Sequence, residues 1–551
     1  MVSLPMDQSP TGAPTEKKSF FRRGLLYLAI VLIAAVIVGV LAVLRLNTTS
    51  TTTQGADYIE GLPKDEVTIG ILSEVSGRYP KVPFDVDSFA MNNNVFEGLT
   101  VLRNGKLQSA LGESWTNPDN LTWRVRLRRG VKFHSGNAFT ANDVKYTIEE
   151  AKKKENKDWM SSFMAPRVDS VEVIDEWTVE LKTKNPDPTL LYWLAYVFIL
   201  SEDQVKKDGL EKAVGTGPYK LVSVNEKEFV LEANNSYWAG VPKVKNLVYK
   251  AFKDEQAVSQ GLETGEADIS VFYTKTYNEP LKNKGFQITS SRSGNVSYLG
   301  FDVNNKKTKY VTADKNPFQD VRVRKAIILA LDVKEILKGA DIEGEALTQI
   351  GTPELIGFST QLRRPDQNIT EAKKLLAEAG FPDGFTVTLD VFESAKLVGE
   401  QIVEQLAEIG IKVNLNTISD FNKFVNKLYA GDFSLYYFGY FPDTLDSIDL
   451  LNTLVHTPDK KGNGSANFSS YSNSELDSIL DKASTTFDVK ERAKVTMQAH
   501  EETMNQLPLM PTYTRVGFFA VRNDIAFKPT PFTYVFGFEL SGRQKATNTT
   551  R

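Results

Sequence analysis

Hydrophobic positions recur along most of this chain with two periods. Leu121–Leu127 (LTWRVRL) alternates apolar and polar residues, which predicts a half-buried strand. Val321–Leu337 repeats its apolar residues with the 3.6-residue period of an amphipathic helix. The residues on that helical face are Val323, Ile327, Ala330, Leu331 and Leu337. From about residue 65 onward the pattern therefore predicts an α/β protein.

The C-terminal half gives the clearest alternation of strands and helices. The predicted order is strand, helix, strand, helix, strand, over Phe385–Val391, Ala395–Ile409, Ile411–Ile418, Asp420–Tyr429 and Phe433–Tyr440. This order favours a doubly wound sheet. Ligands of such sheets bind beyond the carboxyl ends of the strands, which is where Tyr440 and the following loop are expected.

Signals in the N-terminal half are shorter. Val67–Leu72 predicts a strand, and Ser170–Ile174 with Thr178–Leu181 predicts a hairpin. Thr140 followed by Asp143 is a carboxylate variant of the capping box, so we expect a helix to begin near there.

A continuous apolar run stands near the N-terminus. Gly24–Leu44 has 21 residues without a charge, enough for a helix to cross about 30 Å of hydrocarbon. Four basic residues precede it and only Arg45 follows, which predicts a cytoplasmic N-terminus. We expect a disordered cytoplasmic tail (1–23), a transmembrane anchor (24–45), a flexible linker (46–63) and an extracellular or periplasmic domain (64–545). The alternative is a cleaved signal peptide, although this run is longer than usual for one.

Composition excludes several classes of function. The formal net charge is −4, and the sequence has no basic patch of the kind that binds nucleic acid. The chain has no Cys and three His, so neither disulfides nor a His-rich metal site are expected. We expect no metal and no cofactor. No nucleophile elbow, zinc-protease motif or Walker loop is present, and we do not expect an enzyme.

Four groups of segments, in this order, resemble the family 5 extracellular solute-binding proteins, the dipeptide and oligopeptide receptors of ABC importers. The groups are Val95–Trp115 with Leu121–Val144; Gly215–Leu221 with Asn234–Leu247 and Glu263–Ile269; Asn316–Asp332; and Gly431–Asp446 with Ala466–Leu480. Each segment is weak alone, but their order and spacing match over about 470 residues.

The resemblance implies a periplasmic-binding-protein-like fold of two hinged lobes. Lobe one would comprise about 65–90, 213–302 and 510–540, lobe two about 303–509, and an extra domain about 91–212. It also implies a monomer that captures peptides by hinge closure and delivers them to an ABC permease and its ATPases.

The resemblance also implies where a peptide would bind. The family's amine-binding motif corresponds to residues 439–447, so Asp443 would accept the ligand's α-amino group and Asp446 would be the second acid. Tyr440 stands where the family has Trp, and Asn94 is a further candidate for lining the site. Ser447 replaces the usual Pro, and the acids also fit an ordinary polar loop.

Two other functions stay open from the sequence. The same architecture would suit a non-peptide cargo such as an oligosaccharide, an opine or a nickel complex. A sensory ectodomain is the other, although 23 residues before the apolar run are too few for a signalling domain.

Overall fold

The computed structural model of the protein describes residues 58–75, 86–103, 105–153 and 165–546. The compact unit Glu60–Gln544 contains the sheets described below. Within the described ranges, no helix combines the length and the apolar composition that a membrane crossing needs. The expected anchor at 24–45 lies outside the described residues.

The first sheet has eight strands, in the order β13-β20-β12-β2-β11-β10-β9, with β15 paired to β20. Its strands are β2 (Lys64–Ile71), β9 (Tyr219–Val224), β10 (Glu228–Ala233), β11 (Val244–Ala251), β12 (Ile269–Phe272), β13 (Gln287–Arg292), β15 (Gly344–Ala346) and β20 (Tyr513–Val521). The helices that neighbour these strands along the chain are α2 (Val86–Asn93), α7 (Glu255–Thr264) and α8 (Asn278–Asn283). The sheet is assembled from four segments far apart in sequence.

The second sheet has five strands, in the order β17-β16-β18-β14-β19. They are β14 (Val296–Phe301), β16 (Phe385–Phe392), β17 (Ile411–Ile418), β18 (Leu435–Tyr440) and β19 (Leu509–Pro511). The helices of this part are α9 (Val321–Ala330), α10 (Val333–Gly339), α11 (Ile369–Glu378), α12 (Lys396–Ala407), α13 (Phe421–Tyr429), α14 (Ser447–Leu454), α15 (Ser474–Ser484) and α16 (Val489–Gln506). Side chains of α9 to α12 pack in one apolar core, whereas Phe424 of α13 belongs to another. Helices therefore cover both faces, as a doubly wound sheet requires.

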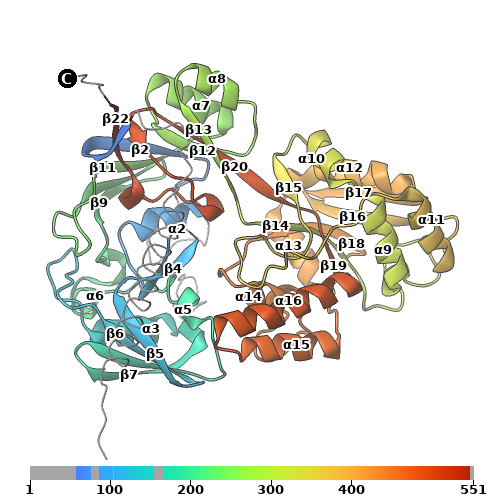
Figure 1. The fold of residues 1–551 in the computed structure, drawn as a ribbon, viewed down its shortest axis with the longest axis horizontal. Helices are drawn as coiled ribbons and strands as arrows, with labels where there is room; N and C mark the ends of the chain where they lie inside the picture. Colours follow the sequence, from blue (N-terminus) through green and yellow to red (C-terminus); the bar gives the residue numbers. More distant parts are fainter. Residues whose placement is uncertain (1–57, 76–85, 104, 154–164, 547–551) are drawn as a thin grey trace, which may run out of the picture. The chain divides into compact units, whose positions relative to one another are not determined.

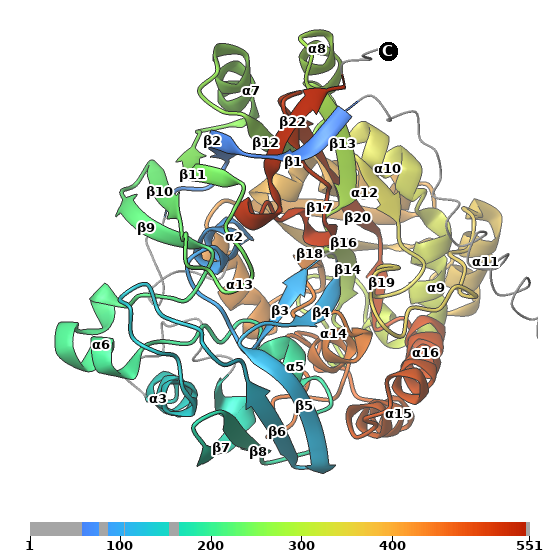
Figure 2. The ribbon, with the colours of Figure 1, turned by 60° about the vertical axis from the view of Figure 1, so that its left-hand side comes forward.

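Residues 91–212, here called the insert, carry a four-stranded antiparallel sheet of order β5-β6-β8-β7 and a hairpin of β3 and β4. The elements are β3 (Thr100–Arg103), β4 (Lys106–Ser109), β5 (Gly112–Asp119), β6 (Thr122–Leu127), β7 (Val168–Asp175), β8 (Thr178–Thr183), α3 (Ala141–Ala151), α5 (Leu190–Trp193) and α6 (Glu202–Asp208). Helix α3 lies beside β7 and β8 (Figure 2). Its N-terminus has the predicted capping box of Thr140 and Asp143.

The remaining elements are short. They are β1 (Tyr58–Leu62), β21 (Ile525–Ala526), β22 (Ser541–Lys545) and the 3₁₀ turns Ala165–Arg167, Leu210–Lys212, Pro317–Gln319, Glu393–Ala395, Pro531–Thr533 and Gly537–Glu539. Strand β21 pairs antiparallel with β22.

Two short connections, residues 292–296 and 511–513, join strands of the two sheets directly, and longer connections lead to and from β15. Figure 1 shows β20 leading from one sheet to the other. The two short connections are bonded to each other, since Ser293 N donates to Arg515 O (2.8 Å) and Thr512 N donates to Ser297 O (2.8 Å). A pair of adjacent connections is the arrangement around which two parts of a protein can rotate.

Two expectations differ from the structure. The single helix expected over Val321–Leu337 is divided into α9 and α10, because Leu331 leaves the helical conformation and Asp332 accepts from the N–H groups of Lys334 and Glu335 to start α10. Strand β14, which the resemblance placed with lobe one, pairs with β18 and β19 of the second sheet. The lobe boundaries themselves stay a prediction.

Gly215 and Gly217 allow the insert to lie against the start of β9. A Cβ atom at Gly215 would stand 1.9 Å from Val95 O, and one at Gly217 would stand 2.5 Å from Asn94 O. The close approach permits hydrogen bonds from Gly217 N to Val95 O (2.9 Å) and from Tyr219 N to Asn94 O (2.9 Å). This glycine pair leads into strand β9 and has a packing role.

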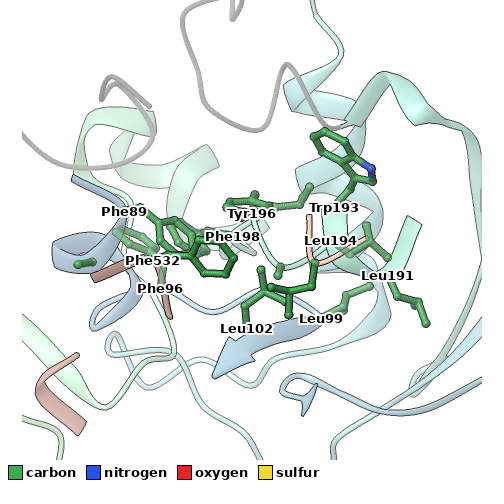
Figure 3. Packing of buried hydrophobic residues seen from close by; sticks show 14 of the residues in the cluster. Phe89, Phe96, Leu99, Leu102, Leu191, Trp193, Leu194, Tyr196, Phe198 and Phe532 are labelled. Atoms are coloured by element: carbon green, nitrogen blue, oxygen red, sulfur yellow. The ribbon is translucent and has the colours of Figure 1, made fainter. Parts of the chain in front are cut away.

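The apolar core at this junction is largely aromatic. Phe89, Phe96, Tyr196, Phe198 and Phe532 gather there (Figure 3). The ring centroids of Phe89 and Tyr196 are 4.9 Å apart, and those of Phe89 and Tyr534 are 5.2 Å apart. This cluster joins α2, the insert and the C-terminal segment into one packed wall.

Candidate functional site

The carboxyl ends of three strands meet at one edge of the second sheet. Strand β16 is parallel to both β17 and β18, so Phe392, Ile418 and Tyr440 end their strands on the same side. The loop after β18 carries Asp443, the residue that the resemblance pairs with a ligand amine. The topology therefore places this carboxylate where open α/β sheets bind ligands.

Asp443 is held by one hydrogen bond and has room for more. Tyr440 Oη donates to Asp443 Oδ2 (3.1 Å), and within the described ranges no residue donates to Oδ1. Burial raises the pKa of the Asp443 carboxyl to about 6, against the opposing effects of the Tyr440 hydroxyl and of Arg167. The arrangement is an acid that is ionised at neutral pH and incompletely paired.

The insert supplies the surroundings of this carboxylate on the other side. The charge of Asp443 contributes to raising the pKa of the buried Tyr196 hydroxyl, after the larger effect of burial. Arg167 lies near Asp443 but is committed elsewhere, because its Nη1 is 3.0 Å from Asp187 Oδ2 and its guanidinium lies 3.8 Å from the centre of the Trp193 ring. No described cation therefore forms an ion pair with Asp443.

Tyr440 orients Asp443. Its side chain is half-buried, and burial followed by the nearby Asp443 charge raises the pKa of its hydroxyl. The phenol therefore stays protonated and acts as a fixed donor to the carboxylate. The structure brings these two predicted residues together.

Asp446 takes a different place from the one implied by the resemblance. It is fully buried, with Oδ2 2.8 Å from Arg492 Nε and Oδ1 accepting from Ile448 N (3.2 Å) at the start of α14. Arg492 also donates to the carbonyl oxygens of Thr486 and Phe487. With both oxygens occupied by the protein, Asp446 anchors the loop and is not carried into the proposed site.

Asn94 is likewise occupied by the protein. Its Nδ2 donates to Ala90 O (2.8 Å) and to Tyr249 Oη (2.8 Å), and its Oδ1 accepts from Gly537 N (2.9 Å). The residue is buried, and its contacts fasten α2 to the first sheet and to the C-terminal segment. This leaves no group of Asn94 to bind a solute.

A groove of about 800 Å³ runs between the insert and α14, and no motif of the sequence predicts it. Arg167, Asp187 and Thr189 line it on one side, and Asp449 and Asn452 on the other. Asp449 bridges the groove, since its Oδ1 accepts from Thr189 Oγ1 (3.1 Å). The groove is large enough for a small solute, but neither Asp443 nor Tyr440 is among the residues that line it.

Burial raises the pKa of Asp449 at this edge as well, as it does for Asp443 and Asp446. Asp449 Oδ2 accepts from Thr444 Oγ1 (2.6 Å), and burial raises its pKa to about 7 despite the opposing effect of Arg167. The only sequence signal for Asp449 was the density of acids after β18. Because an amphipathic helix also contains such acids, that signal did not separate Asp449 from surface residues.

The described ranges hold no group of three His, Asp or Glu residues placed to bind a metal ion. The polar groups of the site are instead the open Asp443 carboxylate and its tyrosine, and the groove beside them adds carboxylate, guanidinium, lysine, threonine and amide side chains. Such groups bind ammonium and peptide-like groups through hydrogen bonds.

Comparisons with known proteins agree on one family. The model of the bacterial extracellular solute-binding proteins, family 5 (middle part), matches residues 106–462. Heme-binding protein A of Haemophilus influenzae is 26% identical over 498 residues, covering 82% of this chain and 88% of that protein. Glutathione-binding protein GsiB of Salmonella choleraesuis is 27% identical over 471 residues, covering 82% and 89%.

A solved structure shares the fold. The ABC transporter-associated periplasmic binding protein DppA from Helicobacter pylori, in complex with the peptide STSA, has a TM-score of 0.71 and 22% sequence identity to this chain. The match covers 87% of this chain and 98% of that protein. The α/β periplasmic-binding-protein-like fold expected from the sequence is thereby confirmed.

The buried pair of Asp446 and Arg492 gives a test of the structural role of Asp446. We predict that Asp446→Ala lowers the free energy of unfolding by about 3–5 kcal/mol, because it leaves a buried guanidinium without its counterion. Urea denaturation followed by circular dichroism measures this change.

A matched control lies on α16, the helix that carries Arg492. Lys494 pairs with Glu491 at 2.6 Å, but both side chains are about 60% exposed, so Lys494→Ala should change the free energy of unfolding by less than about 1 kcal/mol. Equal effects of the two substitutions would contradict the structural role given to Asp446.

Proposed function

The chain belongs to the family 5 bacterial extracellular solute-binding proteins, and from this premise we propose that it captures peptides through their free α-amino group. In this proposal the Asp443 carboxylate accepts the ligand's ammonium, and Tyr440 holds the carboxylate in place. The protein then delivers its cargo to the permease of an ABC importer.

The single observation that carries the proposal is the incomplete pairing of Asp443. The half-buried Asp443 carboxylate is incompletely solvated, and its raised pKa reflects that loss. An ammonium group placed against the open Oδ1 would restore a charge-assisted hydrogen bond to each partner. A neutral sugar would leave the charge uncompensated, so the site favours an amine-bearing ligand over an oligosaccharide.

The relatives support a peptide-like cargo without fixing it. One is named for glutathione, another for heme, and the structurally similar DppA holds a four-residue peptide. Cargo therefore differs between members of the family. We therefore base the proposal of a peptide cargo for this chain on Asp443 rather than on what any one relative binds.

Closure would come from rotation about the two short connections at residues 292–296 and 511–513. The Thr189 to Asp449 hydrogen bond is one contact that can hold the insert against α14. A ligand that bonds to both sides of the groove would favour the closed arrangement by its contacts to both.

We further propose that residues 24–45 anchor the protein in the cell membrane and that residues 46–57 form a tether. The end of the expected linker, Tyr58–Leu62, is strand β1 and does not belong to the tether. The charge-free run and the basic residues before it support this part of the proposal. A tethered receptor stays close to its permease without being lost from the cell. We expect it to act as a monomer.

The contact between Asp443 and the ligand amine predicts the effect of Asp443→Asn on binding. We predict that this substitution weakens the binding of trialanine at pH 7.5 by at least about thirtyfold, because the ligand ammonium loses its ionised partner. Isothermal titration calorimetry on the full-length protein, purified in a mild detergent, measures the dissociation constant.

Two controls distinguish a direct contact between Asp443 and the ligand amine from a general effect of negative charge near the site. Glu393 follows β16 at the same edge and is exposed, so Glu393→Gln removes one negative charge nearby and should leave the affinity within about twofold. N-acetyl-trialanine, which lacks the ammonium, should bind the wild-type protein no better than trialanine binds Asp443→Asn. If the acetylated peptide binds as tightly as trialanine, the proposed role of Asp443 is wrong.

The titration of Asp443 predicts how the affinity for a peptide depends on pH. Asp443 has a pKa of about 6 in the free protein, and only its ionised form pairs with an ammonium. The affinity for trialanine should therefore fall by up to about tenfold per pH unit below pH 6. It should also decline towards pH 8, because the ligand's own α-amino group, with a pKa of about 8, loses its proton there. Titrations between pH 5 and 8 measure this slope.

The Asp443→Asn protein should lack this fall, because its amide does not titrate. A slope that persists in the variant would place the titrating group elsewhere, with Asp449 the next candidate.

A further inference from the structure

Helix α13 carries apolar side chains that the protein does not cover. Phe424 and Leu428 of this helix are fully buried. Phe421 and Tyr429, however, are 52% and 63% exposed, and Val425 between them is only partly buried. These three residues are spaced by four, so they form one continuous stripe along the helix, here called the α13 stripe.

The buried side of α13 explains why the stripe remains outside. Phe424 packs on Phe392 and Phe438, with ring centroids 6.3 and 5.9 Å apart. This contact fixes the rotation of the helix against the second sheet. The stripe lies to one side of that contact and gains partial support from Phe392 beside Phe421 (5.3 Å) and from Phe468 beside Tyr429 (5.0 Å).

The stripe adjoins the residues of the proposed amine site. Tyr429 packs on Phe468, and Phe468 packs on Phe438 of β18, with ring centroids 5.0 and 5.8 Å apart. Strand β18 ends at Tyr440, which donates to Asp443. Phe421 begins α13 just after β17, at the edge where β18 ends and Asp443 follows. Phe441, between Tyr440 and Asp443, is a further exposed ring, at 37%.

Other exposed apolar side chains of the described residues lie on different elements. Val222 is on β9 of the first sheet, Val241 is in the loop before β11, and Ile174 is on β7 of the insert. Apolar side chains exposed singly are ordinary, whereas several together beside a polar site indicate a binding surface.

We propose that the α13 stripe is the wall against which apolar side chains of the bound peptide pack, so that the cargo is peptides with apolar residues next to a free amino terminus. This inference rests on the proposed function, because Asp443 fixes the end of the peptide from which the side chains are counted.

The physical reason is the burial of apolar surface on both partners. Each leucine of a bound peptide that moves from water onto Phe421 or Tyr429 removes apolar area from solvent, and the protein rings lose exposed area as well. A serine in the same place gains almost nothing from that contact. The wall should therefore discriminate by side chain, whereas Asp443 discriminates by the amine.

The experiment compares trileucine with triserine on the full-length protein by calorimetry. Wild type should bind trileucine at least tenfold more tightly, with a more negative heat-capacity change of binding. In the double variant Phe421→Ser/Tyr429→Ser the preference should fall below threefold, while triserine affinity changes by less than threefold.

The matched control is Val222→Ser/Val241→Ser, which removes two exposed apolar side chains from the part of the chain around the first sheet. It should keep the full preference for trileucine. Because the stripe residues are mostly exposed, the variants should fold, and unchanged thermal unfolding checks this. The single variants Phe421→Ser and Tyr429→Ser should each lose part of the preference.

The outcomes separate this inference from the function it rests on. If both tripeptides bind through Asp443 but the stripe variant keeps its preference, or wild type has none, the inference is overturned and the proposed function stands. If neither tripeptide binds wild type, both are overturned.

Discussion

The Asp443 carboxylate lies where water does not fully solvate it, and the protein compensates only part of that loss. Tyr440 supplies one hydrogen bond, while the nearest guanidinium, that of Arg167, is engaged by Asp187. A charge left partly unpaired in such surroundings makes the free protein poised to bind a cation. The specificity that we assign to the protein depends on this imbalance.

The rest of the structure keeps that carboxylate in place. The buried ion pair of Asp446 and Arg492 fixes the loop after β18. Asp449 accepts hydrogen bonds from Thr444 of this loop and from Thr189 of the insert. The loop is therefore tied to α16 on one side and to the insert on the other. A rigid loop matters because an ammonium partner must be held at hydrogen-bond distance.

Elements with a strong period were predictable from the sequence. Strand β17 has the predicted bounds, Ile411–Ile418, and the alternation of β6 matches its pattern of buried and exposed residues. The division between α9 and α10 was missed. The Asp332 side chain starts α10 by accepting hydrogen bonds from backbone N–H groups, and such bonds leave no trace in the spacing of hydrophobic residues. Periodicity gives the element but not each local end.

The site was only partly predictable, for a related reason. Asp443 was found through a short motif, but the partners of Asp446 and Asn94 stand 46 and 443 residues away, and only folding brings them together. The α13 stripe shows the same limit: the apolar arc predicts the helix, but which part of the arc is buried depends on Phe392 and Phe438 of the sheet.

The most direct measurement of the central claim is the number of protons exchanged when trialanine binds at pH 6, obtained by calorimetry in buffers of different ionisation enthalpy. Because Asp443 is about half protonated there and an ammonium partner would ionise it, we expect the release of about half a proton per peptide bound. No proton release, or the same release from the Asp443→Asn protein, would contradict the account.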